Sequence, residues 1–131
     1  MSCTESTVTL AFDHAAEIMN EKPDSAKLVL DGIRRSELRT RATRARFALL
    51  YSQAMDKCYI DTDNDSLISV ALKYYTKHGT DHEKAMVYYY QSVVFQNGKN
   101  VEAEVEALIN AQTYVEKSND EYLQALIYHV L

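Results

Sequence analysis

The chain contains few residues that interrupt helices. Its 131 residues include three glycines and a single proline, Pro23. An all-β fold needs a turn roughly every ten residues, and glycine and proline supply many of those turns. Their scarcity argues against a β-sandwich or β-barrel and favours an all-α fold.

Cysteine is scarce, and tryptophan and long apolar runs are absent. The two cysteines, Cys3 and Cys58, are too few for a disulfide framework and lack the spacing of metal ligands. No stretch approaches the roughly 18 consecutive apolar residues of a membrane-spanning helix. Because 47% of the residues are hydrophobic, the chain can bury a core without disulfides or metals. We expect one globular domain over residues 1–131, with no transmembrane segment in this sequence.

Positive charge is in the minority and is unevenly distributed. The chain has 14 basic and 19 acidic residues, a formal net charge of -5. Nucleic-acid phosphates are bound by basic surfaces, so we predict no direct nucleic-acid binding by this segment. All arginines lie between Arg34 and Arg46, and they point to different sides of a helix. We expect them to form salt bridges with acids of neighbouring helices; binding of an anionic ligand is the alternative.

Apolar residues recur every three or four positions along most of the chain, which is the spacing of one face of an α-helix. The pattern predicts about seven helices. They pair into hairpins at about residues 7–34, 37–78 and 81–117, followed by an unpaired helix over 119–131.

Local signals set the predicted helix boundaries in the first half of the chain. Pro23 is expected to end the first helix near Glu21. Asp24 or Ser25 is then the expected N-cap of the second helix. The third helix is predicted over 37–58.

The second half of the chain has clearer boundaries. Asp63 and Asp65 are expected to begin the fourth helix, and Gly79 and Gly98 to end the fourth and fifth. The segment 101–107 alternates apolar and acidic residues, as a strand does. We predict a helix there because alanine and glutamate are good helix formers and poor strand formers.

The sequence repeats itself with a period of forty residues. Residues of the same size recur at this spacing, as in Ala45, Ala85 and Ala125, Ile68 and Leu108, Tyr74 and Tyr114, and Tyr88 and Tyr128. A two-helix unit cannot bury its apolar face alone, so such units stack on their neighbours.

The repeat resembles the tetratricopeptide repeat family in a lengthened form. Helix A of that family carries a pattern of large, small and aromatic residues, matched here by Tyr88, Ser92 and Phe95, and helix B carries alanines, matched by Ala103 and Ala111. The period of forty exceeds the usual 34 or so, which leaves HEAT-like helix pairs as a competing interpretation. Further segments are similar to a bacterial group of tetratricopeptide proteins, namely Pro23-Asp24-Ser25-Ala26, residues 45–51, Asp65-Ser66-Leu67-Ile68 and Tyr74-Tyr75.

The resemblance implies a right-handed superhelical stack of antiparallel helical hairpins. It also implies a non-enzymatic scaffold that binds a protein or peptide partner in a concave groove lined by helix A. The residues nominated for this groove are Arg46, Leu49, Gln53, Lys57, Met86, Tyr89, Val93, Gln96 and Asn97. The alternative function is the sensory or input region of a membrane-linked transcriptional regulator, because some members of the bacterial group continue into such regions.

The bacterial group also implies a location outside the cytoplasm. Ser2-Cys3-Thr4 has the form of a lipoprotein cleavage site, which would leave Cys3 as a lipid anchor followed by a polar tether at residues 5–7. An ordinary N-terminus of a cytoplasmic protein is the alternative. We expect the chain to be a fragment of a longer protein.

Two clusters of metal-ligand residues are better explained by helix capping. The segment 61–65 begins like a calcium loop, but Ser66 and Leu72 stand where that loop needs glycine and glutamate. His78 and His82 belong to different helices, and Asp81 between them is the expected N-cap of the fifth helix. We predict no metal site and no cofactor.

No set of residues has the arrangement of a catalytic site, and Cys58 is expected to be a passive thiol. Of the consecutive tyrosines 88–90, we expect two to lie in the core and Tyr89 to face the groove. The helix over 119–131 carries more apolar surface than one neighbouring hairpin can cover, which predicts self-association through this helix.

Overall fold

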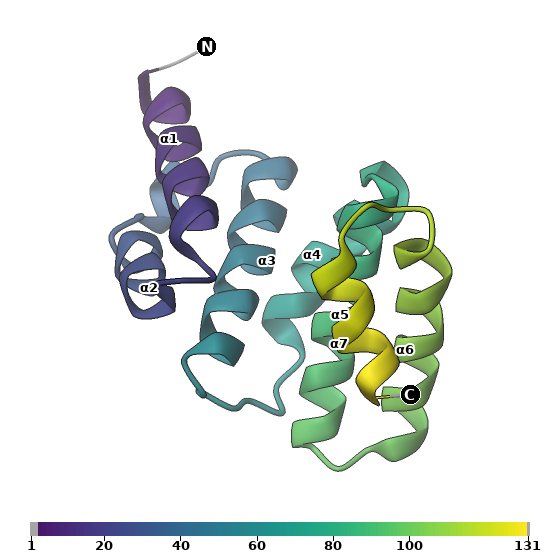
Figure 1. Cartoon of the computed structure of the whole chain (residues 1–131). Helices are drawn as coiled ribbons and strands as arrows, with labels where there is room; N and C mark the ends of the chain where they lie inside the picture. The colour runs from purple at the N-terminus through teal and green to yellow at the C-terminus, as the bar shows by residue number, and fades with distance from the viewer. Residues whose placement is uncertain (1–2, 131) are drawn as a thin grey trace. The chain divides into compact units, whose positions relative to one another are not determined.

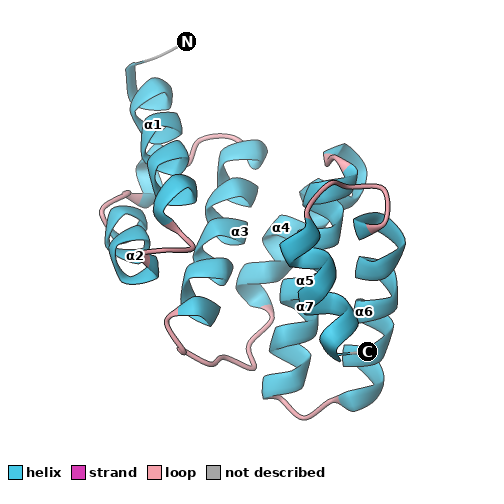
Figure 2. Cartoon of the chain, viewed as in Figure 1, coloured by secondary structure: helices cyan, strands magenta, loops and turns pink. Residues whose placement is uncertain are grey.

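The computed structural model describes the backbone of residues 3–130 and the side chains of residues 7–130. In this part of the chain every regular element is helical and no strand is present (Figures 1 and 2). The elements are α1 (Cys3–Ile18), α2 (Pro23–Asp31), the 3-10 turn η1 (Arg35–Glu37), α3 (Arg41–Lys57), α4 (Ser66–His78), α5 (Asp81–Asn97), α6 (Val101–Val115) and α7 (Glu121–Val130). The predictions of an all-α fold and of seven α-helices are confirmed.

The helices form two compact units. The first extends to Ile60 and contains α1, α2 and α3; the second begins at Asp61 and contains α4 to α7. The boundary falls within the hairpin predicted over 37–78, so that the two helices of this hairpin belong to different units.

The core of the first unit lies between α1, α2 and α3. Apolar residues from one face of each helix meet there, namely Val8, Phe12 and Ala15 on α1 with Met19 directly after it, Ala26 and Leu30 on α2, and Leu50 and Ala54 on α3. The α1 residues fall at intervals of three or four, as the sequence predicted. On the outside of this core, Arg46 of α3 pairs with Asp13 of α1 at 2.7 Å.

Three boundaries of the first unit differ from those predicted. The first helix ends at Ile18 rather than Glu21. Lys22, not Asp24 or Ser25, is the N-cap of α2, because proline lacks an N–H and has the φ angle of a helix, which suits it to the first helical position at Pro23.

The third helix begins at Arg41, four residues later than predicted from Glu37. Thr40 is its N-cap, and its hydroxyl accepts a hydrogen bond from the backbone N–H of Thr43 at 3.1 Å. Residues Arg35–Glu37 form a separate 3-10 turn, which apolar spacing alone does not distinguish from the start of a helix.

In the second unit, α5 packs against both α4 and α6, and α6 also packs against α7. Since α5 has neighbours on two sides, its buried residues lie all around it, namely Ala85, Val87, Tyr89, Tyr90, Ser92 and Val94. Tyr88 stacks on Tyr114 of α6, with ring centroids 6.0 Å apart. The alternating segment that begins at Val101 is helical, as predicted.

The period of forty is present in the helix boundaries as well as in the sequence. Helices α3, α5 and α7 begin at Arg41, Asp81 and Glu121. Each follows a residue whose side-chain oxygen accepts a hydrogen bond from a backbone N–H three positions later, as in Thr40, Thr80 and Asp120. Thr80 rather than Asp81 is therefore the N-cap of α5, because its hydroxyl reaches the N–H of Glu83 while Asp81 is already helical.

Candidate functional site

The first unit has an open hollow between α2 and the C-terminal end of α3. Its volume is about 320 Å³, and its lining residues are Asp24, Lys27, Leu28 and Asp31 from α2 and Cys58 and Ile60 from the end of α3. The four α2 residues are spaced three or four positions apart, so they share one face of that helix. The packing of α2 on α3 brings this face next to Cys58 and Ile60.

Asp31 is held on both of its carboxylate oxygens. Lys27 donates to Oδ2 at 2.9 Å, and the Tyr51 hydroxyl donates to Oδ1 at 2.6 Å. These hydrogen bonds, from Tyr51 first and then Lys27, lower the pKa of Asp31. The same contacts raise the pKa of Lys27 and of Tyr51, since each donates to the carboxylate. Lys27 and Asp31 therefore neutralise each other within the hollow.

Cys58 and Asp24 form the second polar contact of the hollow. The thiol donates a hydrogen bond to Asp24 Oδ1 across 3.2 Å between sulfur and oxygen. Burial, followed by this bond to the carboxylate, raises the pKa of Cys58. Because the thiolate is the nucleophilic form, the raised pKa opposes reaction at Cys58, and the passive thiol expected from the sequence stays a prediction.

Large apolar side chains stand exposed around the hollow. Leu28 is 71%, Tyr59 91% and Ile60 42% exposed. Tyr59 has a φ angle of 58°, the left-handed conformation that favours glycine. It lies at the end of α3, where the N–H of Ile60 donates to the carbonyl of Met55 at 2.8 Å and closes the helix.

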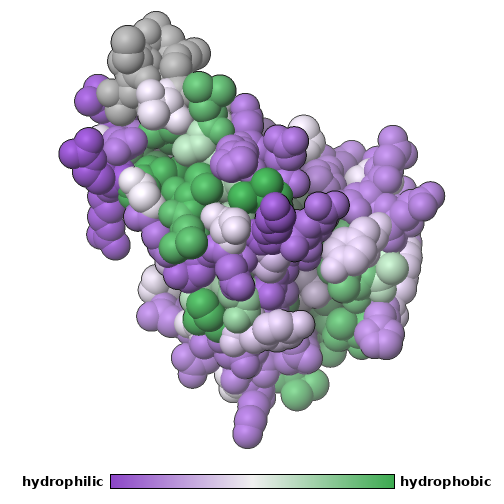
Figure 3. Space-filling model, turned by 60° about the vertical axis from the view of Figure 1, so that its left-hand side comes forward, coloured by the Kyte–Doolittle hydropathy of each residue, from purple (hydrophilic) through white to green (hydrophobic). Residues whose placement is uncertain are grey.

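Figure 3 shows one face of the molecule, coloured by hydropathy. Apolar side chains, in green, gather in patches on this face between hydrophilic side chains, in purple. The large apolar residues of the first unit that are exposed are Leu10, Leu28, Tyr59 and Ile60. The described surface of the first unit is therefore apolar in part as well as charged.

The groove residues predicted on α3 have different environments. Leu49 is buried, and Gln53 and Lys57 are half-buried. Arg46 is occupied within the unit: it pairs with Asp13, and its guanidinium lies 5.3 Å from the centre of the Phe12 ring.

The groove residues predicted on α5 are also mixed. Met86 and Val93 are half-buried and Gln96 is exposed. Asn97 donates a hydrogen bond to the carbonyl of Thr62 at 3.0 Å, which ties the end of α5 to the loop before α4. The α3 and α5 groups belong to different units, so their combination into one groove stays a prediction.

The consecutive tyrosines of α5 differ from the arrangement expected of them. Tyr89 is 8% exposed and meets the ring of Tyr90 edge-on, with centroids 5.0 Å apart. Tyr88 is half-buried. Tyr89 is therefore not the exposed member of the three, because α5 is covered on more sides than a helix at the edge of a stack.

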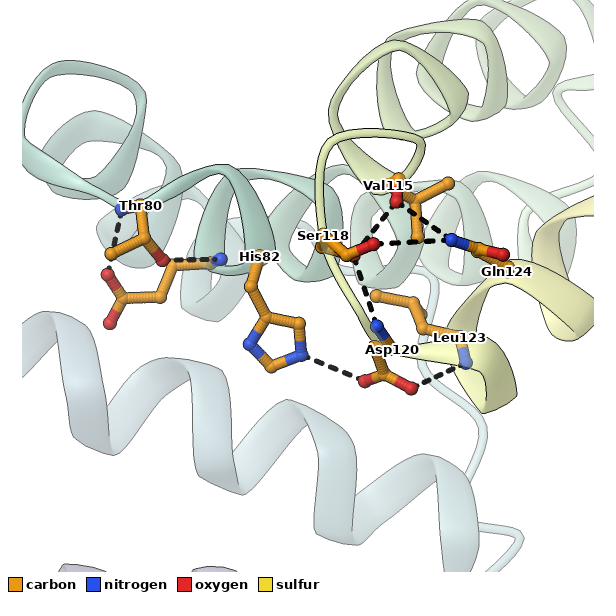
Figure 4. Close-up of polar contacts among 8 residues, drawn as sticks. Thr80, His82, Val115, Ser118, Asp120, Leu123 and Gln124 are labelled. Atoms are coloured by element: carbon orange, nitrogen blue, oxygen red, sulfur yellow. Dashed lines mark hydrogen bonds and ion pairs between the residues drawn. The ribbon is translucent and has the colours of Figure 1, made fainter.

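A network of polar contacts joins the start of α5 to the loop between α6 and α7 (Figure 4). The His82 ring lies 2.8 Å from Oδ2 of Asp120, whose Oδ1 accepts a hydrogen bond from the N–H of Leu123 at 2.9 Å. The Gln124 amide donates to the carbonyls of Val115 and Ser118. Partial burial acts to raise the pKa of Asp120, but the hydrogen bonds from Leu123 and His82 outweigh it and leave this pKa lowered. These contacts hold the loop between α6 and α7 against the start of α5 and the first turn of α7.

The residues with metal-ligand side chains do not converge. His82 contacts Asp120, whereas the His78 ring lies 5.0 Å from that of Tyr74. Within the described residues, no group of three or more histidine, cysteine or acidic side chains could hold a metal ion. In the segment 61–65, Asn64 rather than an aspartate accepts the hydrogen bond from the backbone N–H of Ser66, at 2.9 Å. Asp65 precedes α4 without a side-chain capping bond, because its neighbour already provides one.

One of the arginines, Arg46, makes the salt bridge to a neighbouring helix that the sequence predicted, whereas Arg34 and Arg44 make local contacts. Arg46 reaches a neighbouring helix through Asp13, and Arg34 pairs with Glu37 at 3.3 Å. Arg44 donates to the carbonyl of Leu38 at 3.2 Å. Binding of an anionic ligand by these arginines stays a prediction.

Comparison of the chain with protein-family models, curated proteins and solved structures gives no match. None of the helices within residues 3–130 combines the length and the apolar character needed to cross a membrane, as the sequence predicted. The hollow beside α2 combines oriented polar groups with exposed apolar side chains. Its polar groups are fixed by internal hydrogen bonds, the pKa of its thiol is raised, and its rim is apolar.

Proposed function

We propose that the chain is a non-enzymatic helical-repeat module that binds a protein or peptide partner, and that the hollow of the first unit is a contact site for that partner. The observation that carries the proposal is the exposure of Leu28, Tyr59 and Ile60 around a hollow lined by charged side chains. Protein interfaces combine such apolar anchors with a few oriented polar groups, and tyrosine is enriched among the residues that contribute most to binding.

The exposure of the Tyr59 ring supports the proposal. A left-handed residue with a large side chain is costly, by roughly 1–2 kcal/mol. The ring is 91% exposed, so contacts within the chain recover little of that cost. Closure of α3 by the N–H of Ile60 accounts for the left-handed backbone, so it is the exposed aromatic ring at this position that favours a role outside the fold.

The fixed polar groups of the hollow also favour binding. Asp31, Lys27 and Tyr51 already hold one another in place before any partner arrives. A partner therefore loses less free energy to the ordering of side chains than it would on a surface of mobile lysines and glutamates.

The proposed architecture is a right-handed stack of hairpins of the tetratricopeptide type. It is supported by the helix starts at Arg41, Asp81 and Glu121 and by the equivalent caps that precede them. The groove nominated from the sequence stays a prediction based on resemblance. The role as an input region of a membrane-linked regulator and the extracytoplasmic location stay predictions based on resemblance.

Selection from a library of random peptides displayed on phage tests the proposal. Peptides enriched on the immobilised wild-type protein are synthesised, and their affinities are measured by fluorescence polarisation. We expect the triple variant Leu28→Ser, Tyr59→Ser, Ile60→Ser to bind them more than about tenfold more weakly, because interface anchors each contribute upwards of about 1 kcal/mol.

The matched control is the double variant Val101→Ser, Ile109→Ser, which removes exposed apolar side chains from α6 in the second unit. It should bind the peptides as the wild type does. Failure to enrich any peptide, or equal affinity for the wild type and a folded triple variant, would contradict the proposal.

A further inference from the structure

We infer that the hollow accepts a lysine or arginine side chain of the partner polypeptide, with its aliphatic stem against Leu28 and Ile60 and its charged head at Asp24. This inference rests on the proposed function, and it adds the chemistry that the hollow recognises.

The charges of the lining residues leave Asp24 without a cationic partner. The hollow contains two carboxylates, Asp24 and Asp31, and one ammonium group, Lys27. Lys27 pairs with Asp31 at 2.9 Å, and Tyr51 occupies the other oxygen of that carboxylate. Asp24 accepts only the weak S–H donor of Cys58, and no ion pair joins it to another described residue. The lining therefore carries one uncompensated negative charge.

The walls beside Asp24 match the stem of a long basic side chain. Lysine and arginine place their methylene groups on apolar surface while the charged head stays in a polar environment. Leu28 and Ile60 line the hollow and are both exposed, so they provide that apolar surface. An acidic side chain would be repelled by the carboxylate of Asp24. A purely apolar side chain would contact Leu28 and Ile60 but leave that carboxylate without a cationic partner.

The size and position of the hollow indicate a side chain that belongs to a polypeptide. Its volume of about 320 Å³ lies at the lower end of the range for ligand sites, roughly 300–1,000 Å³. Such a volume suits one long side chain better than a packed helix. Tyr59, which lies between the lining residues Cys58 and Ile60, offers an exposed ring for the residues on either side of that basic side chain.

The test uses the peptides enriched on the wild-type protein. In each peptide, arginines are replaced by citrulline and lysines by norleucine, which keep the aliphatic stem of the side chain and remove its charge. We expect the neutral peptides to bind roughly two- to fivefold more weakly, the effect of a solvent-accessible ion pair with good geometry. The variant Asp24→Asn should weaken the charged peptides by a similar factor and leave the neutral peptides unaffected.

The control is Glu17→Gln, which removes an exposed carboxylate of α1 outside the hollow. It should leave affinity and its dependence on sodium chloride unchanged. The inference is overturned if charged and neutral peptides bind equally, or if Glu17→Gln has the same effect as Asp24→Asn. In either case, peptides that still depend on Leu28, Tyr59 and Ile60 would uphold the proposed function, so the two failures can be told apart.

Discussion

At the scale of single residues, Tyr59 and Lys99 provide an internal comparison. They are forty positions apart, and both have a left-handed φ angle, 58° and 59°. Each follows the C-cap of a helix. The backbone N–H of the next residue, Ile60 or Asn100, donates a hydrogen bond to the carbonyl of Met55 or Phe95 and so ends the helix. The backbone requirement is the same at both sites, whereas a bulky aromatic ring is present at only one of them.

Replacement of these residues by glycine should raise stability. Glycine adopts the left-handed conformation without strain, so relief of the strain outweighs the greater flexibility of the unfolded chain. We expect Tyr59→Gly and Lys99→Gly each to increase the free energy of unfolding by about 0.5–1 kcal/mol, measured by urea denaturation. Peptide binding should be lost in Tyr59→Gly and retained in Lys99→Gly. A Tyr59→Gly protein that binds normally would mean that the ring has no role in recognition.

The Tyr51–Asp31 hydrogen bond should make stability depend on pH. Since the folded-state pKa of Asp31 is lowered, its contribution is present above the unfolded value of about 3.9 and is lost as the pH falls through the folded value. Tyr51→Phe removes one of the two bonds responsible. We expect it to reduce the free energy of unfolding by about 0.5–1 kcal/mol at pH 7, since the pair is largely solvent-accessible.

The measurement is urea denaturation of the wild type and Tyr51→Phe over a range of pH. The difference between the two proteins should shrink as the pH falls below about 4, where Asp31 begins to bind a proton. A difference of the same size at all acidic pH values would show that packing of the ring, and not the bond to Asp31, is responsible.

The hollow itself was not predicted from the sequence. Its lining comes from one face of α2 and from residues after the end of α3, and their approach depends on how the two helices pack. The sequence predicted Cys58 to be a passive thiol from its position at the end of a helix, where the helix dipole disfavours the thiolate. Tyr59 belongs to no apolar stripe of a helix, so periodicity does not single it out. Its left-handed backbone is recognised only by comparison with Lys99, forty residues later in the structure.

At the scale of elements, helix boundaries were predicted best where a glycine or a run of strong helix formers marks them. Gly79 and Gly98 follow α4 and α5, and the helix formers of 101–107 give α6 in spite of their alternation. The predictions were wrong at α2 and α3. Proline can end one helix or begin the next, and Pro23 begins α2.

The start of α7 depends on Asp120, and its replacement should loosen that helix. Asp120→Ala removes both the cap on Leu123 and the contact with His82, which should cost about 1 kcal/mol. Asparagine also caps helices, so Asp120→Asn should retain most of that stability and lose only the charge-dependent contact with His82. Hydrogen exchange of the α7 amides should therefore be slowest in the wild type, faster in Asp120→Asn and fastest in Asp120→Ala.

The same contacts predict how the effect varies with pH. Since the folded-state pKa of Asp120 is lowered, the stability it contributes is present above about pH 3.9 and is lost as the pH falls through the folded value. In urea denaturation, the free energies of unfolding of the wild type and of Asp120→Asn should converge as the pH decreases. Equal protection of α7 in all three proteins at neutral pH would show that packing alone holds the helix.

At the scale of the whole molecule, equivalent positions of the repeat are covered to different extents. Ala85 and Tyr90 of α5 are 0% and 4% exposed, whereas their counterparts Ala125 and Val130 of α7 are exposed, Val130 at 44%. The helix α5 packs against two helices of its unit, and α7 packs against α6. Apolar surface is therefore present on α7 where the equivalent surface of α5 is buried.

We expect this surface of α7 to promote self-association of the chain. The double variant Tyr122→Ser, Val130→Ser removes two exposed apolar side chains from α7, 58% and 44% exposed. It should weaken association severalfold in sedimentation equilibrium, because exposed apolar patches drive protein contacts. The double variant Val101→Ser, Ile109→Ser of α6 is the control. If the control weakens association as much, α7 is not the contact.

The central claim is that a peptide partner binds around the hollow of the first unit. Hydrogen exchange of the wild-type protein, with and without a peptide selected on it, tests this claim most directly. We predict slower exchange in Pro23–Asp31 and in residues 55–60, with the rest of the chain little changed. Protection confined to the groove residues of α5, from Met86 to Asn97, or to α7 would contradict the claim.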